Sequence, residues 1–117
     1  MSPRGAEART RSVRLRASAP VFAALGDATR LRLVTRLGTN GPLSIARLTA
    51  GTDVTRQAVT KHLHVLADAG LARGARRGRE RLWKLEPAPL EEARRCLDLS
   101  SQQWDEALAR LKSAVER

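Results

Sequence analysis

The stretch of sequence that decides the fold is Thr55-Arg56-Gln57-Ala58-Val59-Thr60-Lys61-His62-Leu63-His64-Val65-Leu66, the first part of an expected helix over residues 55–69. At about 100° per residue, the apolar side chains fall on one arc of this helix. That arc holds Ala58, Val59, Leu63, Val65, Leu66 and Ala69, with His62 among them. The opposite arc holds Arg56, Gln57, Thr60, Lys61 and His64. Such a helix can pack one face on a core and present the other to the major groove of DNA, where Gln pairs with adenine and Lys with guanine or phosphate.

A short helix and a tight turn are expected immediately before this helix. Ser44 is placed to cap the short helix, whose Leu48 points inward, and Gly51-Thr52-Asp53 supplies the turn. Farther upstream, Asp27 is the expected cap of a helix over residues 28–37. A short helix, a turn and a second helix form a helix-turn-helix. An ordinary amphipathic helix with a solvated polar face fits the same pattern, so the downstream segment matters.

The hydrophobic period changes after Gly70. Residues 71–75 and 81–85 are short, roughly alternating segments around a glycine-containing turn, which predicts a β-hairpin. Four arginines lie at or near its tip: Arg76, Arg77, Arg79 and Arg81. They pack poorly but can neutralise phosphates or enter a minor groove, although a solvated arginine-rich loop is the alternative. The expected fold is mainly α with a small β-hairpin wing, a winged helix-turn-helix.

The charge is concentrated in the part of the chain that holds these two motifs. The formal net charge is +10. Residues 55–84 hold eight basic and two acidic side chains, whereas residues 86–117 hold five and seven. This distribution predicts one positive surface and a polyanionic partner. With only one Phe, two Trp and no Tyr, the chain lacks a stacking platform for single strands, so double-stranded DNA is the expected partner.

The chain divides into three expected regions. Residues 1–16 are polar and arginine-rich, and we expect a disordered basic arm that is either a solvated tail or a DNA-touching segment. Residues 17–86 form the winged helix-turn-helix DNA-binding domain, and residues 87–117 form a C-terminal dimerisation helix. No apolar run has the length of a membrane span or a signal-peptide core, so the sequence predicts a cytoplasmic protein without membrane contact.

The C-terminal helix carries a repeating apolar stripe. Leu90, Leu97, Trp104 and Leu111 recur every seven residues, with Leu108 and Val115 in a companion position that Arg94 and Ser101 interrupt. One small domain has little left to cover so long a stripe, so we expect pairing with a second copy. The alternative function is a protein-interaction module, in which this helix binds an unlike partner and the basic face is incidental.

Catalytic and metal-binding patterns are missing from the sequence. It has no Ser/His/Asp or Cys/His set, phosphate loop or carboxylate cluster, so we expect no enzyme and no cofactor. His62, on the apolar arc, is interpreted as a structural histidine. His62 and His64 are two residues apart on a helix and cannot converge on one metal. The lone Cys96 excludes an intrachain disulfide and is more often a packing residue than a sensor.

Three stretches in the same order resemble ArsR-family regulators. Residues 21–33 (VFAALGDATRLRL) resemble the opening of these repressors, residues 57–71 (QAVTKHLHVLADAGL) their recognition helix and the start of the wing, and residues 79–85 (RERLWKL) their second wing strand. The resemblance covers residues 18–115. It implies a homodimer whose first and last helices form the interface, bound to an imperfect palindrome in a promoter, usually as a repressor.

The resemblance and the helical faces together give two sets of expected contact residues. The side chains expected to contact DNA are Thr55, Arg56, Gln57, Thr60, Lys61, His64, Arg76, Arg77, Arg79 and Arg81. Those expected at the dimer interface are Val21, Phe22, Leu97, Trp104, Leu108 and Leu111. Founding members of the family sense metals through Cys-x-Cys on the third helix, where this chain has Ser44-Ile45-Ala46. We therefore expect no metal site, and the sequence identifies no operator and no small-molecule effector.

Overall fold

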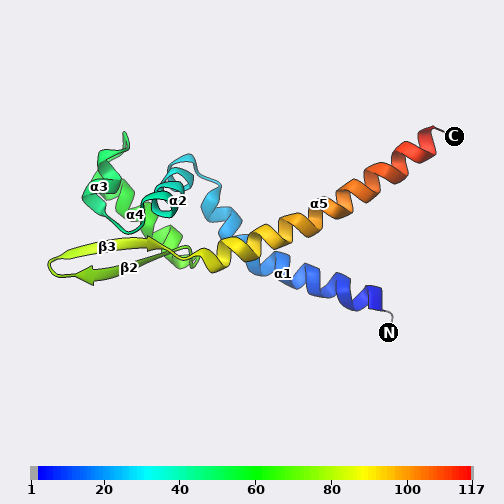
Figure 1. Cartoon of the computed structure of the whole chain (residues 1–117), viewed down its shortest axis with the longest axis horizontal. Helices are drawn as coiled ribbons and strands as arrows, with labels where there is room; N and C mark the ends of the chain where they lie inside the picture. The colour runs from blue at the N-terminus through cyan, green and yellow to red at the C-terminus, as the bar shows by residue number, and fades with distance from the viewer. Residues whose placement is uncertain (1–2, 117) are drawn as a thin grey trace.

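The computed structural model describes residues 3–116 as a mainly helical chain with one small antiparallel sheet. Its elements in order are α1 (Pro3–Leu25), α2 (Ala28–Asn40), β1 (Leu43–Ser44), α3 (Ile45–Ala50), α4 (Arg56–Asp68), β2 (Ala72–Arg77), β3 (Glu80–Leu85) and α5 (Pro87–Val115). Figure 1 shows α2, α3 and α4 gathered at one end, with the β2–β3 hairpin projecting beside them and α1 and α5 extending the other way. The expected winged helix-turn-helix is confirmed.

Each of the three central helices begins at a side chain that caps its first turn. Asp27, Ser44 and Thr55 accept hydrogen bonds from the backbone N–H three residues later, at 2.9, 3.2 and 3.1 Å. These bonds satisfy N–H groups that have no partner inside the helix. After α4, Gly70 has a φ of 78°, in the left-handed region that favours glycine, and turns the chain into β2. Local sequence therefore sets where α4 begins and ends.

The core lies between α2, α3, α4 and the base of the wing. Its largest fully buried side chains are Trp83, Leu33, Leu37, Leu48, Leu63, Leu66, Leu71 and Val59. Burial of a Leu or Val side chain of this kind contributes roughly 1.5–3 kcal/mol relative to exposure. The apolar arc of α4 faces this core as predicted, except that Val65 at its margin is 41% exposed. The polar arc of α4 therefore faces outward.

The sheet has three strands in the order β1-β3-β2, all antiparallel. In β2 and β3, which form the wing, Gly74 lies opposite Trp83 and Arg76 opposite Arg81. Strand β1 pairs Leu43 with Trp83 and was not predicted, because two residues are too short to show an alternating pattern. By pairing with β3, β1 joins the wing to the start of α3.

The expectation of a disordered arm needs correction. Helix α1 begins at Pro3, so residues 3–16 are helical, and residues 1–2 lie outside the described residues. Arginine and alanine are good helix formers, and α1 packs against α5. At this contact Ser18 is 3% exposed, and its Oγ lies 3.6 Å from the Sγ of Cys96. Packing against α5 stabilises the helical conformation of residues 3–16. The high charge of this segment gives no sign of that packing.

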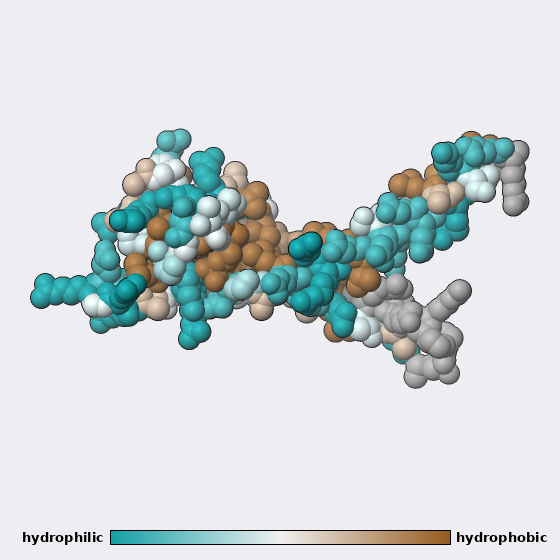
Figure 2. All heavy atoms as spheres, viewed as in Figure 1, coloured by the Kyte–Doolittle hydropathy of each residue, from teal (hydrophilic) through white to brown (hydrophobic). Residues whose placement is uncertain are grey.

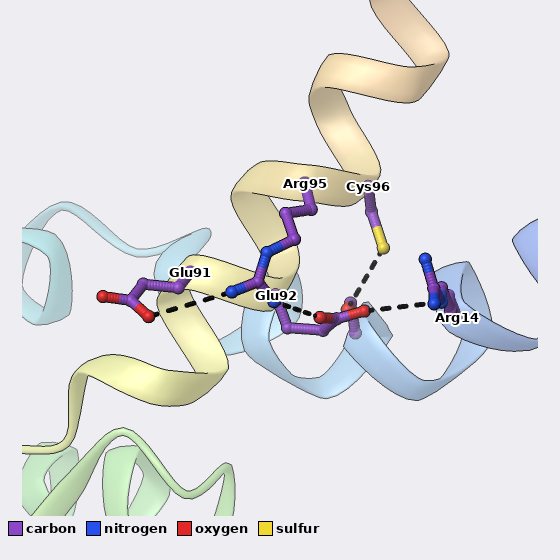
Figure 3. A network of polar contacts seen from close by, with 6 residues as sticks. Arg14, Glu91, Glu92, Arg95 and Cys96 are labelled. Carbon is purple, nitrogen blue, oxygen red and sulfur yellow. Dashed lines mark hydrogen bonds and ion pairs between the residues drawn. The ribbon is translucent and has the colours of Figure 1, made fainter.

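Charged side chains add to the contact between α1 and α5 (Figure 3). Arg95 Nη1 donates to Glu92 at 2.7 Å, and Glu91 lies 4.0 Å from the same guanidinium. Glu92 also lies 3.9 Å from Arg14 Nε across the two helices. Such exposed pairs contribute little each, about 0–1 kcal/mol, so the buried contact of Ser18 and Cys96 is the firmer link.

Among residues 3–116, no helix is both long and apolar enough to cross a membrane.

Candidate nucleic-acid interface

The exposed face of α4 brings together the side chains that the sequence predicts as DNA readers. Arg56, Gln57, Lys61 and His64 are all exposed, since the opposite side of the helix is committed to the core. The long cations Arg56 and Lys61, the amide of Gln57 and the imidazole of His64 can each reach a base edge or a phosphate. The side chains on this face can therefore contact the major groove of DNA. Helix α3 and the turn between α3 and α4 support the helix that carries them.

The two threonines of this set are partly engaged within the helix. Thr55 Oγ1 accepts from the backbone N–H of Ala58 as the helix cap. Thr60 Oγ1 donates at 2.9 Å to the carbonyl oxygen of Arg56, and its side chain is half-buried. With its proton used inside the helix, Thr60 can offer DNA its methyl group and an acceptor, which suits contact with a thymine methyl.

The wing carries an open hollow lined by arginines. Gly74, Arg76, Arg79 and Arg81 surround about 440 Å³ of space on one face of the hairpin. Arg76 and Arg81 lie directly opposite each other in the strand pair, an arrangement of like charges that destabilises a sheet. The hollow is therefore strongly positive, which suits the approach of an anion. Figure 2 shows that the projecting end of the hairpin is hydrophilic.

Arg77 lies on the other side of the wing. Side chains alternate along a strand, so Arg77 faces away from the hollow that Arg76 lines. Its cross-strand neighbour is Glu80. The four wing arginines predicted as one set therefore divide between two faces, which sequence spacing alone does not reveal because the register depends on the turn at Gly78.

Known proteins are similar to this chain in sequence and in fold. The family described as a helix-turn-helix domain matches residues 25–75. The HTH-type transcriptional regulator Rv2034 of Mycobacterium tuberculosis is 39% identical over 85 residues, which are 73% of this chain and 76% of that protein. The solved ArsR-like transcriptional regulator from Rhodococcus sp. RHA1 is 36% identical, with a TM-score of 0.72 over 84% of this chain and 92% of that one. The chain belongs to the ArsR family.

Membership of the ArsR family confirms the resemblance and makes the chain a transcriptional regulator with a helix-turn-helix DNA-binding domain, not an enzyme. A more distant solved structure, the homodimeric winged helix-turn-helix DNA-binding domain of Mb0332 from Mycobacterium bovis, has the same fold. It is 21% identical, with a TM-score of 0.53 over 94% of this chain and 93% of that one.

Two of the predicted DNA contacts in this ArsR-family chain also touch the core. The Arg81 guanidinium carbon lies 4.8 Å from the centre of the Trp83 ring. The His64 ring meets the same indole edge-on, with centroids 5.8 Å apart and planes at 89°. Trp83 is 1% exposed, so it lies buried between the wing and α4. Sequence reasoning missed these contacts for two reasons. His64 lies on another element, and the stacking of Arg81 on Trp83 depends on the strand register and on Gly74.

His62 has partners within the protein, as expected of a structural histidine. Its Nδ1 lies 3.2 Å from Arg30 Nη1 and 3.9 Å from Asp27 Oδ2. Arg30 Nε also donates to the Ala24 carbonyl oxygen at 2.6 Å, which ties the end of α1 to α4. The backbone N–H of Arg30 holds the pKa of Asp27 below its ordinary value of 3.8, and the nearby His62 and Arg30 side chains act in the same direction.

Helix α5 of this ArsR-family chain exposes most of the residues expected at a dimer interface. The exposed fractions of Leu97, Trp104, Leu108 and Leu111 are 55%, 69%, 59% and 62%. The expectation for α1 needs correction. Val21 is 4% exposed and belongs to the core of its own protomer, because it points toward the domain and not along the free face of the helix, whereas Phe22 is half-buried.

The cysteine and histidine positions do not form a thiolate metal site. Among the residues that the structure describes, no group of three or more His, Cys, Asp or Glu side chains is arranged to hold a metal ion. Ser44 uses its hydroxyl oxygen to cap α3, where it accepts from the backbone N–H of Arg47. Cys96 is buried against Ser18, a packing position.

Proposed function

We propose that this ArsR-family regulator is a homodimeric repressor that binds a palindromic promoter site, with α4 in the major groove and the wing on the adjacent backbone. The observation that carries the proposal is the joint placement of two surfaces. The exposed face of α4 adjoins the wing through the contact of His64 with Trp83, and the arginine hollow lies on the same face of the wing as Trp83. One duplex can meet both surfaces.

Each surface supplies a different part of recognition. In α4, Gln57 can pair with adenine and Lys61 with guanine or phosphate, which reads sequence. In the wing, Arg76 and Arg79 meet the sugar–phosphate backbone through the hollow, which adds affinity on every sequence. Arg77, on the other face, contacts a neighbouring phosphate. The repressor role follows if this footprint covers a promoter.

The exposed stripe of α5 supports the homodimer. Trp104 and its apolar neighbours have no cover among the described residues, and a second copy presents the same stripe in return. Mb0332, which shares this fold, is a homodimer. Two-fold symmetry would set two copies of α4 about 34–36 Å apart, one helical turn of DNA, and so requires inverted half-sites. The proposed function is that of a cytoplasmic protein, as the sequence predicts.

Selection of bound duplexes from a random pool tests this function directly. The expected result is an imperfect palindrome whose half-sites are about 10–10.5 base pairs apart, centre to centre, or a multiple of that spacing. Transcription in vitro from a promoter that contains the selected site should fall when the protein is added. Enrichment of no sequence, together with normal folding and capture of an unlike protein by α5, would instead support the protein-interaction module.

A further inference from the structure

Arg81 is the wing arginine whose guanidinium lies on an aromatic ring of the same molecule. It covers the face of Trp83 at 4.8 Å, a cation–π contact. The indole Nε1 is buried and has no hydrogen-bond partner among the described residues, so contacts with neighbouring side chains set the orientation of the ring. His64 of α4 meets that same ring edge-on. Arg81, Trp83 and His64 therefore connect the wing to the helix that is expected to read bases.

The glycine at position 74 makes this stack sterically feasible. A Cβ atom there would lie 2.6 Å from Arg81 Nε and 3.0 Å from Arg81 Nη2. Gly74 is the cross-strand neighbour of Trp83, so its bare backbone leaves the ring face open to the guanidinium. Glycine weakens a strand interior and often marks a close approach of another group. Here the group that approaches is the Arg81 side chain.

We propose that Arg81 is a positioning residue for DNA reading and not one of the phosphate-binding arginines. Its guanidinium packs on the Trp83 ring and restricts the orientation of that ring, and the ring in turn contacts His64. These contacts fix the angle between the wing and α4 in the free protein, before DNA binds. The inference rests on the proposed function, because it concerns how α4 and the wing fit one duplex. It separates Arg81 from Arg79, which lines the same hollow from the turn between β2 and β3.

Three variants distinguish positioning from charge. Arg81→Gln removes both the stack and the charge, whereas Gly74→Ala keeps every charge and displaces the flexible guanidinium from the ring. Arg79→Gln removes a wing charge and leaves the stack intact, as the matched control. Affinity for the selected duplex and for a scrambled duplex is measured at several salt concentrations, together with the melting temperature of each variant.

Positioning predicts that Arg81→Gln and Gly74→Ala each reduce discrimination between the two duplexes about tenfold, with little change in salt slope. Arg79→Gln should lower the salt slope by about one unit and leave discrimination unchanged. If Arg81→Gln lowers the slope and Gly74→Ala binds as the wild type does, Arg81 is a phosphate contact and the proposal is wrong. It is equally wrong if both variants lower only the melting temperature.

A measurement on the free protein keeps this test independent of DNA binding. The chain has two histidines, so the imidazole ring signals in a proton–carbon NMR spectrum can be assigned with a single His62→Gln variant. Gly74→Ala and Arg81→Gln should both shift the His64 signals, since the neighbouring indole moves, and Arg79→Gln should not. Unchanged His64 signals would refute the positioning role whatever the DNA result. Absence of discrimination by the wild-type protein would refute the proposed function itself.

Discussion

Arg36 of α2 donates from Nη1 to the carbonyl oxygen of Leu48 at 2.6 Å, at the C-terminal end of α3. Its Nη2 donates to the carbonyl oxygen of Arg47 at 2.9 Å. Helix α3 has only six residues, so these carbonyls have no further helical turn to satisfy them. Gly51 leaves room for the guanidinium, since a Cβ there would lie 2.6 Å from Nη1. One side chain thus fixes the first helix of the helix-turn-helix.

Arg36→Ala should lower the free energy of unfolding by about 1–3 kcal/mol, because it leaves two backbone acceptors without their charged donor. Equilibrium unfolding in urea measures the change. Arg32→Ala is the matched control, since Arg32 is an exposed arginine on the same helix and its removal should alter stability by no more than about 0.5 kcal/mol. Equal effects of the two variants would contradict the capping role of Arg36.

Asp27 should make stability depend on acid pH. Its pKa in the folded protein lies below the ordinary value of 3.8, chiefly because the backbone N–H of Arg30 donates to it. A lowered pKa means that the ionised carboxylate stabilises the fold above the unfolded-state pKa, and that this contribution disappears as pH falls through the folded-state pKa. The affected window therefore lies below about pH 4.

Asp27→Asn tests this dependence because Asn caps helices as well as Asp does but does not titrate. The urea midpoint of the wild-type protein should fall more steeply below about pH 4 than that of the variant. Unfolding midpoints measured between neutral pH and about pH 2.5 give the comparison. Parallel curves for the two proteins would show that Asp27 does not contribute to the acid dependence.

The range of an interaction along the chain decides whether the sequence predicts it. The caps at Asp27 and Ser44 and the two faces of α4 depend on neighbours within one or two turns, so the sequence predicted them. The helical start of α1 depends on packing against α5. The contact of Arg81 with Trp83 depends on the strand register and on the absence of a side chain at Gly74. The α1–α5 contact joins residues far apart in the chain. The Arg81 contact lies within one hairpin, but an alternating pattern does not determine the exact strand register.

Trp104→Ala should give a folded monomer. Trp104 is 69% exposed in the protomer, so its removal leaves the domain core intact, while a Trp buried at an interface is worth roughly 3–5 kcal/mol. Sedimentation velocity measures the oligomeric state, and circular dichroism checks folding. Gln102→Ala, an exposed change on the other side of α5, should leave the dimer unaltered. A Trp104→Ala protein that sediments as the wild-type dimer would remove Trp104 from the interface.

The sharpest prediction separates α4 from the wing. Gln57→Ala should relax the base preference in both half-sites and leave the salt slope nearly intact, because a base-edge contact discriminates by about 1–3 kcal/mol and releases few counterions. Removal of Arg77 and Arg79 together should weaken binding on every sequence and flatten the slope by about two units, since each arginine neutralises one phosphate.

Affinities for the selected duplex and for a scrambled duplex, measured at several salt concentrations, give both quantities for each variant. If Arg79 inserts into a narrow minor groove, the wild-type protein should also prefer A·T-rich sequence beside the half-sites. The double variant should lack that preference. The contrast between the two variants is decisive because each acts on one quantity and spares the other. An equal drop in affinity on both duplexes for Gln57→Ala would mean that α4 is not the element that reads the bases.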